Sequence, residues 1–405
     1  MLVFYAILKG QRRHDLAEQT EFDVAIIGAG IAGASLACEL SPDVSVLLLE
    51  MEAQPGYHST GRSAAMFVDT YGPPPIRALS RASADFLESP PKGFSESPLL
   101  SQRGVIMIAR NDQLTSLENM VGDLSDSGGV RRLDAAETEA AIPILRKGYV
   151  AAGFANDRVS DIDVNALHQG YLRKFRSSGG IIKTASKVIE TKHTLGRWQV
   201  TTSNGTYAAK TIVNAAGAWA DSIGKMAGAE AIGLIPKRRT AMVVAAPSGV
   251  NPDSWPMVID IDEQFYLKPD AGRLLISPAD ETSSLPCDVQ PDELDVAICV
   301  DRIETAFDLP IRRIENKWAG LRSFVDDKCP VCGFDDTVEG FFWLAGQGGY
   351  GIQTAPALAV IAACLIMDRS VPQHLLDHGI DLADLAPGRS TLKTDKKENL
   401  KRRIS

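Results

Sequence analysis

Apolar side chains near the start of the chain follow one another in two different patterns. Residues 22–27 and 44–49 are short, predominantly apolar runs, whereas residues 34–40 keep their apolar side chains at helical spacing. A strand buried on both faces gives a continuous run, and a helix gives a period of 3.6. The pattern therefore predicts a strand, a helix and a second strand, the βαβ unit of a parallel sheet.

The middle of the chain mixes helical and strand-like segments. We expect a helix over 76–87, a strand over 104–109, and a helix that Asp163 caps and that ends at the glycines 179–180. Three strand-like segments follow, at residues 187–189, 198–201 and 211–217. An Asn204-Gly205 pair between the last two is typical of a hairpin.

Alternation of apolar and polar residues dominates the next part, which predicts antiparallel strands at residues 240–245, 257–260, 265–268 and 274–277. Asp270 and Gly272 mark a hairpin between the last two. A helix over 294–307 and a strand around Trp318 follow. A final apolar run, 341–344, leads into glycine-rich residues 345–351 and an apolar helix over 357–367.

The first glycine-rich turn lies between the strand and the helix of the βαβ unit. Gly28 permits a tight turn, Gly30 lets a pyrophosphate approach the backbone, and Gly33 lets the helix pack on the strand. The helix N-terminus favours the phosphates. Glu50 closes the second strand, where a carboxylate can accept hydrogen bonds from ribose hydroxyls and disfavours a 2′-phosphate. We expect a dinucleotide site.

The second glycine-rich turn, with Gly348, Gly349 and Gly351, also joins a strand to a helix. A reduced flavin carries negative charge at one edge of its ring, and a helix N-terminus stabilises such a charge. We therefore interpret this turn as the flavin end of the site. A close crossing of packed elements is the alternative interpretation.

Composition and charge exclude several classes of protein. The chain has 405 residues, more than one core usually serves, with 45% hydrophobic and 23% charged residues, so we expect two ordered domains. A net charge of -9 argues against nucleic acid as a partner. No run approaches the roughly 18 consecutive apolar residues of a membrane span.

Cysteines and histidines give no metal signal. Cys38, Cys299 and Cys364 stand alone in apolar surroundings and are expected to be reduced core residues. Cys329 and Cys332 have a metal-like spacing, but no second Cys/His pair lies nearby, so we predict no metal site.

Both ends of the chain are expected to be solvated tails, over residues 1–21 and 390–405. Apolar residues 1–8 precede the first basic residues, the reverse of the order in a secretory signal peptide. The C-terminal residues are rich in lysine and arginine and poor in apolar side chains. We expect a cytoplasmic protein, with at most a peripheral contact at the inner face of the membrane.

Several motifs together resemble the D-amino-acid oxidase family of FAD-dependent oxidoreductases. They are the first glycine turn with Glu50, the segment V-N-A-A-G-A-W at 213–219 and the turn G-G-Y-G at 348–351. Residues 54–65, 236–239, 318–324 and 346–354 are most similar to the bacterial D-arginine dehydrogenases of this family. The resemblance extends over residues 22–382.

The resemblance implies an α/β fold: an FAD-binding Rossmann-like domain and a second substrate domain built on a mixed, largely antiparallel sheet. We expect the first domain to be discontinuous, over 22–72, 151–232 and 325–385, and to carry helices on both faces of its sheet. The substrate domain then comprises 73–150 and 233–324.

Noncovalent FAD is the cofactor that the resemblance implies. Glu50 would bind the adenosine ribose, and Val188 would present its backbone to adenine. The complete set expected at the cofactor is Gly28, Ala29, Gly30, Ile31, Ala32, Gly33, Glu50, Ser59, Thr60, Ser63, Ala64, Ala65, Val188, Ala216, Gly217, Trp219, Gly348, Gly349, Tyr350, Gly351, Ile352 and Gln353.

The resemblance also implies how the substrate binds. Arg239, Tyr266 and Arg322 would hold its carboxylate, consistent with the bidentate fork of a guanidinium. The complete substrate set is Tyr71, Arg239, Tyr266, Arg322, Gly349, Gln353, Met66 and Val105, with the Gly349 carbonyl on the amine and Tyr71 in a lid.

Each polar residue of this set has an alternative interpretation. Arg239 could belong to a solvated strand end, and Arg322 could pair with Asp326 or Asp327. Gln353 could cap backbone groups.

Two positions depart from the pattern of the D-arginine dehydrogenases, which have a histidine at Met66 and an acid at Val105. Without that acid a buried guanidinium has no partner, which is costly. We therefore expect an apolar or uncharged side chain to be preferred over that of D-arginine. Alternatively, Asp69 or Glu263 supplies the missing acid.

The expected reaction is oxidative deamination of a D-amino acid, by hydride transfer from Cα to flavin N5, to a 2-oxo acid and ammonia. No obligatory catalytic base is predicted if the amine enters neutral. Oxidation of a secondary amine or a 2-hydroxy acid, or a noncatalytic flavoprotein subunit, are the alternatives. The electron acceptor is expected to be a quinone or another non-oxygen acceptor.

Overall fold

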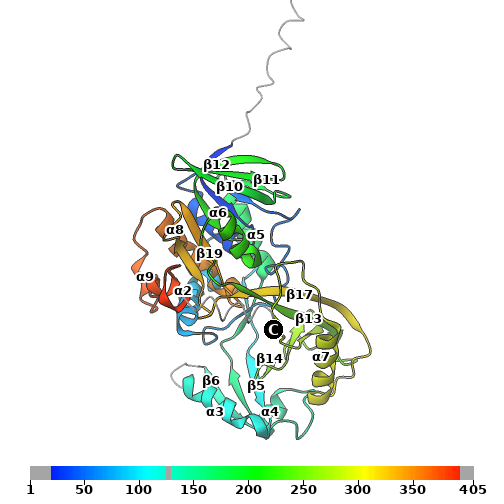
Figure 1. Cartoon of the computed structure of the whole chain (residues 1–405). Coiled ribbons are helices and arrows are strands. Elements are labelled where there is room, and N and C mark those ends of the chain that lie inside the picture. The colour runs from blue at the N-terminus through cyan, green and yellow to red at the C-terminus, as the bar shows by residue number, and fades with distance from the viewer. Residues whose placement is uncertain (1–19, 125–128, 393–405) are drawn as a thin grey trace, which may run out of the picture.

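The computed structural model describes residues 20–124 and 129–392. The expected tails therefore lie largely outside the described residues. Of the remainder, Glu21 opens the first strand and Ser390–Leu392 form a 3₁₀ turn. The described chain forms two sheet-based domains, one above the other in Figure 1.

A parallel sheet forms the centre of the first domain, in the order β9, β2, β1, β12, β19. Its strands are β9 (Ile181–Lys183), β2 (Val46–Leu49), β1 (Glu21–Ile27), β12 (Gly205–Asn214) and β19 (Phe341–Ala345). β1 and β2 with α1 (Ile31–Leu40) between them confirm the predicted βαβ unit. Antiparallel strands extend the sheet, namely β10 (Val188–Thr194), β11 (Arg197–Thr202) and β18 (Val331–Phe334).

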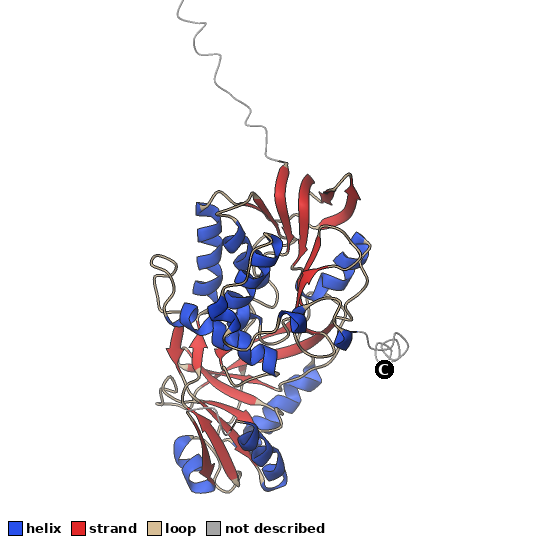
Figure 2. Ribbon diagram, turned by 90° about the vertical axis from the view of Figure 1, so that its left-hand side faces the viewer, coloured by secondary structure: helices blue, strands red, loops and turns tan. Residues whose placement is uncertain are grey.

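Helices cover one face of this sheet. α1 packs beside α5 (Val164–Ser177) and α8 (Gly351–Ile366), and α2 (Pro74–Glu88) packs on α8. The other face is different from what we expected, because among the described residues a single helix, α6 (Ala220–Ala227), covers it. The β10–β11 ribbon contributes the rest of that layer, through the fully buried Trp198. Figure 2 shows most helices of this domain on one side of the upper strands.

The second domain is built on an eight-stranded sheet in the order β17, β13, β16, β15, β14, β5, β7, β6. Only β14 and β5 pair in parallel, so the predicted mixed, largely antiparallel sheet is confirmed. Its strands are β17 (Ile314–Phe324), β13 (Ile235–Ala245), β16 (Arg273–Ser277), β15 (Tyr266–Asp270), β14 (Met257–Asp260), β5 (Val105–Ala109), β7 (Ala152–Asn156) and β6 (Val130–Asp134).

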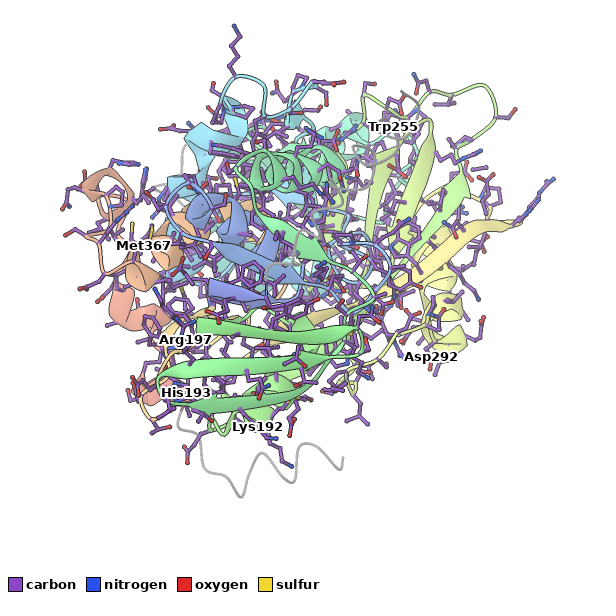
Figure 3. The ribbon with its side chains drawn as sticks, turned by 90° about the horizontal axis from the view of Figure 1, so that it is seen from above. Lys192, His193, Arg197, Trp255, Asp292 and Met367 are labelled. Atoms are coloured by element: carbon purple, nitrogen blue, oxygen red, sulfur yellow. The ribbon has the colours of Figure 1, made fainter. Side chains whose placement is uncertain are left out.

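Short helices cover this second sheet: α3 (Leu114–Asp123), α4 (Ala135–Ala141) and α7 (Glu293–Ala306). The remaining helix of the first domain is α9 (Gln373–Leu376). A small third sheet consists of β3 (Met66–Phe67), β8 (Ser160–Ile162) and β4 (Leu100–Gln102). The sequence pattern did not predict these three strands. In Figure 3 Lys192, His193 and Arg197 mark the β10–β11 ribbon, and Trp255 and Asp292 mark the second domain.

Two segments lie in a different domain from the one expected. α2, assigned to the substrate domain, packs its buried residues Ala78 and Leu79 into the core of the first domain. β7, assigned to the cofactor domain, pairs with β5 and β6 of the second sheet. The sequence pattern of neither segment indicates which core it packs against, because an amphipathic helix or a buried strand is compatible with either one.

Local signals agree with the structure at several turns. The Asp163 side chain accepts a 2.8 Å hydrogen bond from Ala166 N and so caps α5. β15 and β16 are joined by Ala271 and Gly272, with φ of 49° and 77°, as in a tight hairpin. All six cysteines are free thiols, and only Cys287 is exposed. No helix among the described residues is long and apolar enough to cross a membrane.

The packing of α1 on its glycine turn gives a prediction. A methyl group added at Gly33 would lie 1.9 Å from the carbonyl oxygen of Gly28, whereas one added at Gly122 of α3 would meet nothing within 4 Å. We expect Gly33→Ala to destabilise the fold by about 1–3 kcal/mol and to weaken FAD binding. Gly122→Ala should be neutral or stabilise by up to about 1 kcal/mol, as helix propensity dictates.

Thermal unfolding and FAD titration of both variants test this. An equal effect of the two substitutions would contradict the argument, because they make the same chemical change within a helix.

Candidate active site

A channel runs along the carboxyl edge of the parallel sheet. Two cavities of about 150 Å³ each adjoin one another. They share Gly30, Ser59, Thr60, Ala215 and Gly217. One end of the channel is lined by Glu50 and Val188, and the other by Gly348 and Gly349. The structure therefore brings both predicted ends of a dinucleotide site into one continuous space.

The first glycine turn is shaped by close backbone contacts. Gly28 has a φ of 104°, and an added methyl group would lie 2.4 Å from the carbonyl oxygen of Ala215. Ile31 N, at the start of α1, donates a 3.0 Å hydrogen bond to Thr60 Oγ1. The next amides of α1 have no partner within the helix, so they can bind phosphate oxygens.

Glu50 lies at the end of β2, where its side chain is held by backbone groups. It is 7% exposed, and its two carboxylate oxygens accept hydrogen bonds of 3.0 Å from Ala29 N and Glu52 N. Burial raises the pKa of Glu50, and these two hydrogen bonds lower it in part. The carboxylate keeps further lone pairs that can accept from hydroxyl groups in the channel.

His168 on α5 supports the same turn, which the sequence did not indicate. Its Nε2 lies 2.9 Å from the carbonyl oxygen of Ala29, and the residue is 4% exposed. Burial lowers its pKa below the ordinary value. A neutral imidazole that donates from Nε2 therefore fixes the peptide between Gly28 and Gly30.

The second glycine turn begins α8 at the opposite end of the channel. Gly348 has a φ of 54°, and its N–H donates a 2.9 Å hydrogen bond to the carbonyl oxygen of Ser323. An added methyl group would lie 2.2 Å from the Phe324 ring. Only glycine fits here, and the amides at the start of α8 are left at the channel.

A loop at residues 57–65 forms the other wall of this end. Ser59 Oγ donates a 2.6 Å hydrogen bond to the carbonyl oxygen of Leu321, and Trp318 Nε1 donates a 3.0 Å bond to that of Arg62. Both contacts join the loop to β17. Ser63 and Ala64 consequently lie where the channel meets the substrate cavity.

Most residues predicted at the cofactor line this channel. The exceptions are Ala29, Gly33, Ala65, Tyr350 and Gln353. Ala29 and Gly33 shape the turn, and Tyr350 packs against Tyr71 at a centroid distance of 5.2 Å. Two helix N-termini and one carboxylate at the far end are the donors and acceptors that FAD requires, so the channel fits this cofactor.

A larger cavity of about 480 Å³ opens from the flavin end of the channel. It is lined by all the residues predicted at the substrate, namely Met66, Tyr71, Val105, Arg239, Tyr266, Arg322, Gly349 and Gln353. These residues come from β3, β5, β13, β15, β17 and α8, from the loop that precedes α2, and, for Gly349, from the glycine turn before α8. The cavity joins the channel at Arg239, Tyr266 and Arg322.

Arg322 lies at this junction, and no hydrogen bond or ion pair joins its guanidinium to another described residue. Burial lowers its pKa, but Tyr266, Tyr71 and the carboxylate of Glu263 outweigh burial and raise it. The alternative interpretation, in which Arg322 pairs with Asp327 at the surface, does not hold. Asp327 instead binds Arg389 at 2.7 Å. A permanent positive charge thus faces the cavity.

Arg239 is buried beside it, at 8% exposure, and is not a solvated strand end. Its Nη2 lies 3.1 Å from Glu281 Oε1, while its Nε has no hydrogen-bond partner in the described part of the chain. Burial raises the pKa of Glu281, but Lys237 and Arg239 outweigh it and lower the pKa, so Glu281 is ionised.

Gln353 was expected to lie beside the flavin, but its side chain amide binds other protein groups. Its Oε1 accepts a 3.0 Å hydrogen bond from Val68 N, and its Nε2 donates to Ser80 Oγ at 2.8 Å. The amide therefore ties α8 to the strand that carries Met66 and to α2. This agrees with the alternative that Gln353 binds backbone groups.

Tyr71 lines the cavity, and its ring packs edge-to-face on that of Tyr350. Burial and the nearby Glu263 raise the pKa of Tyr71 well above its ordinary value, and they raise that of Tyr350 to about 12. Both hydroxyls are therefore neutral at physiological pH and can donate hydrogen bonds.

Charged residues that were not in the predicted substrate set also line the cavity. Glu263 lies on the wall with a left-handed φ of 53°, and Arg77 and Asp123 lie farther out. Asp69, the other acid considered, does not line it. In the sequence, only its position in a short turn after an apolar strand distinguished Glu263.

Metal chemistry has no site here: no group of three or more His, Cys, Asp or Glu within residues 20–124 and 129–392 could hold a metal ion. Cys329 and Cys332 are buried thiols whose pKa burial raises.

Comparison with known proteins gives the family. The model of the DAO family, FAD dependent oxidoreductase, matches residues 23–365, so the chain belongs to this family and is an FAD-dependent oxidoreductase. Human dimethylglycine dehydrogenase is 27% identical over 416 residues, which cover 94% of this chain and 46% of that protein. The chain thus spans less than half of that relative.

Solved structures agree on the fold. Glycine oxidase from Geobacillus kaustophilus superimposes with a TM-score of 0.79 at 22% identity, covering 92% of this chain and 99% of that one. Iminodiacetate oxidase from Chelativorans sp. gives 0.74 at 22% identity, covering 90% and 98%. The narrower likeness to D-arginine dehydrogenases stays a prediction.

His168 gives a pH-dependent prediction. Its pKa is lowered in the folded protein, whereas the unfolded chain binds a proton near the ordinary value of 6.5. Its contribution to stability is therefore complete above about pH 6.5 and is lost as the pH falls below that value. His168→Gln keeps a donor for Ala29 but cannot titrate, so its stability should fall less than that of the parent between pH 7.5 and pH 5.

Thermal unfolding in excess FAD measures this difference across the pH range. His374→Gln, at an exposed histidine of α9, controls for the substitution itself. Parallel curves for the parent and His168→Gln would be evidence against a buried neutral imidazole.

Proposed function

We propose that this family member oxidises a D-amino acid at Cα, giving an imino acid that water converts to a 2-oxo acid and ammonia. The observation that carries the proposal is Arg322, a guanidinium that no hydrogen bond or ion pair joins to another described residue, at the junction of the cofactor channel and the cavity. FAD, when bound, would accept the hydride that leaves Cα and, with it, both electrons of the oxidation.

Carboxylate binding is the first task of the site residues. Arg322 offers paired N–H donors, and the Tyr266 hydroxyl lines the same junction. Arg239 adds positive charge, although Glu281 neutralises part of it. A bidentate guanidinium fixes the plane of a carboxylate, so it would also orient the Cα–H bond.

Proton transfer needs no side chain in this proposal. No histidine or lysine is present among the described residues that line the cavity. A substrate amine that enters neutral has its lone pair free to form the C=N bond as hydride leaves. The Gly349 carbonyl at the junction is our candidate acceptor for the amine N–H.

The cavity walls support a substrate larger than glycine. Its inner wall is apolar, with Met66, Val105, Met107, Met257 and Ile259. Burying a side chain of leucine size against them contributes about 1.5–3 kcal/mol. Glu263 on the same cavity favours the alternative of a cationic side chain.

A secondary amine is the second candidate. Human dimethylglycine dehydrogenase and the iminodiacetate oxidase are named for substrates with a carboxylate and a substituted amine. The Arg322 site would bind such compounds equally well. We propose a non-oxygen electron acceptor in either case, in line with the dehydrogenases that the motifs resemble.

Anaerobic bleaching of the flavin absorbance separates these candidates. D-amino acids, N-methylglycine, iminodiacetate and 2-hydroxy acids are mixed with the protein in parallel. Bleaching by D-amino acids supports the proposal, and faster bleaching by a substituted glycine supports the second candidate. Bound FAD that no carboxylate substrate reduces would contradict both.

Arg322→Met should raise KM about 10- to 100-fold, because a hydrogen bond to a charged group contributes about 1.5–3 kcal/mol. FAD should stay bound, as its absorbance will show. Arg313→Met, an exposed arginine just before β17, is the matched control and should leave KM within twofold. An unchanged KM in Arg322→Met would sink the carboxylate assignment.

Side-chain preference is tested at Val105. The parent should have a higher kcat/KM for D-methionine and D-leucine than for D-arginine. Val105→Glu should shift the ratio at least tenfold toward D-arginine by supplying a partner charge, whereas the uncharged Val105→Gln should not. D-arginine as the best substrate of the parent would instead implicate Glu263.

A further inference from the structure

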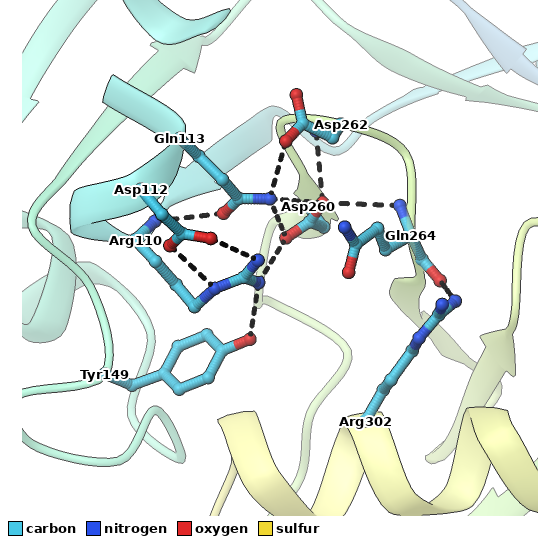
Figure 4. Close-up of polar contacts among 8 residues, drawn as sticks. All are labelled: Arg110, Asp112, Gln113, Tyr149, Asp260, Asp262, Gln264 and Arg302. Carbon is cyan, nitrogen blue, oxygen red and sulfur yellow. Dashed lines mark hydrogen bonds and ion pairs between the residues drawn. The ribbon is translucent and has the colours of Figure 1, made fainter. Parts of the chain in front are cut away.

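A buried carboxylate, Asp260, lies at the end of β14 beyond the cavity wall. It is 0% exposed. Its Oδ1 accepts hydrogen bonds of 3.1 Å from Asp262 N and 3.3 Å from Gln264 N. Gln113 Nε2 donates to both oxygens at 3.0 Å, and Arg110 Nη1 donates to Oδ2 at 3.2 Å (Figure 4). Four donor groups thus converge on this one side chain.

The first consequence concerns the turn between β14 and β15. Asp260 N donates to the carbonyl oxygen of Phe265 at 3.0 Å, and Glu263 N donates to that of Asp260 at 2.8 Å. Glu263 is thereby held at a φ of 53°, a left-handed conformation that is unfavourable for a residue other than glycine. The hydrogen bonds to the Asp260 carboxylate offset this cost.

The turn is held from its other side as well. Arg302 of α7 donates to the carbonyl oxygen of Gln264 (Figure 4). Tyr266 follows at the start of β15. Glu263 and Tyr266 both line the substrate cavity, so the shape of this turn sets where a carboxylate and a hydroxyl face the substrate.

The second consequence concerns α3. Gln113, which is 2% exposed, precedes this helix, and its Nε2 also donates to Asp262 Oδ2 at 3.0 Å. Its Oε1 accepts from Arg110 N at 3.0 Å. α3 forms the outer wall of the cavity through Ser116, Asn119, Met120 and Asp123. Asp260 therefore joins two walls that are far apart in the sequence.

We propose that Asp260 is a positioning residue for substrate binding: with Gln113 it locks the turn that presents Glu263 and Tyr266 and couples that turn to α3. Asp260 itself lines neither the cavity nor the channel. Its loss should therefore weaken substrate binding without altering FAD binding or the rate of the bound complex. The kinetic part of this inference rests on the proposed function.

Asp260→Asn is the principal variant, since it keeps the size of the side chain but places an NH₂ group against the Arg110 and Gln113 donors. KM for the best substrate of the bleaching panel should rise at least tenfold, with kcat and the FAD dissociation constant within about twofold. Hydrogen exchange of the Asp262 and Gln264 amides should become at least tenfold faster.

Asp335→Asn is the matched control. Asp335 is also a turn carboxylate, and it accepts from Thr337 N at 2.9 Å and Trp343 Nε1 at 2.9 Å, away from the cavity. The Asp335→Asn substitution should lower thermal stability without changing KM. An equal rise in KM in this control, or a KM within twofold of the parent in Asp260→Asn, would overturn the proposal.

Gln113→Met provides a milder variant should Asp260→Asn fail to fold. It removes the shared donor but leaves the buried carboxylate, and its KM should rise at least threefold; no rise overturns the proposal. If no carboxylate substrate reduces the flavin, the proposed function fails. Hydrogen exchange then tests the positioning role by itself. Unchanged protection of the Asp262 and Gln264 amides in the variant would refute that role.

Discussion

Two helices that begin at one edge of a parallel sheet determine where everything else in this protein lies. β1 and β19 pair with the two sides of the carboxyl half of β12, and each is followed by a glycine turn and a helix. The N-termini of α1 and α8 therefore converge on one channel. Their partial positive charges add, and an anionic cofactor compensates them. Gly28 and Gly348 are required because their backbones adopt positive φ against neighbouring atoms.

β17 carries this arrangement into the second domain. Its carbonyl groups at Ala319, Leu321 and Ser323 accept hydrogen bonds from Arg62, Ser59 and Gly348, respectively. The same strand carries Arg322 between these contacts. One strand thus fixes the loop at residues 57–65, the second glycine turn and Arg322 in a single register. A shift of that strand by one residue would turn Arg322 to the other face of the sheet.

Buried charges in the second domain are compensated by protein groups in nearly every case. Asp161 lies 2.7 Å from both Lys268 and Arg103, and Arg238 lies 2.6 Å from Asp295. Arg322 differs, because its guanidinium has no such partner among the described residues. An uncompensated charge in a partly buried position is costly, and a carboxylate bound there would offset that cost. The same reasoning applies to the turn at Glu263, whose strained backbone is held by Asp260.

The sequence by itself determined the βαβ unit, both glycine turns, the largely antiparallel second sheet and the residue types of the site, because these depend on local periodicity and on short motifs. Arg239, Tyr266 and Arg322 could be named from motifs, and they line one cavity. Tertiary structure alone decided the contacts that depend on pairing between distant segments. α2 lies in the first core, β7 joins the second sheet, and an antiparallel ribbon covers one face of the first sheet beside α6. The roles of His168, Gln353 and Asp260 likewise required the fold, since a buried polar side chain shows its function only through the partner that the packing places beside it.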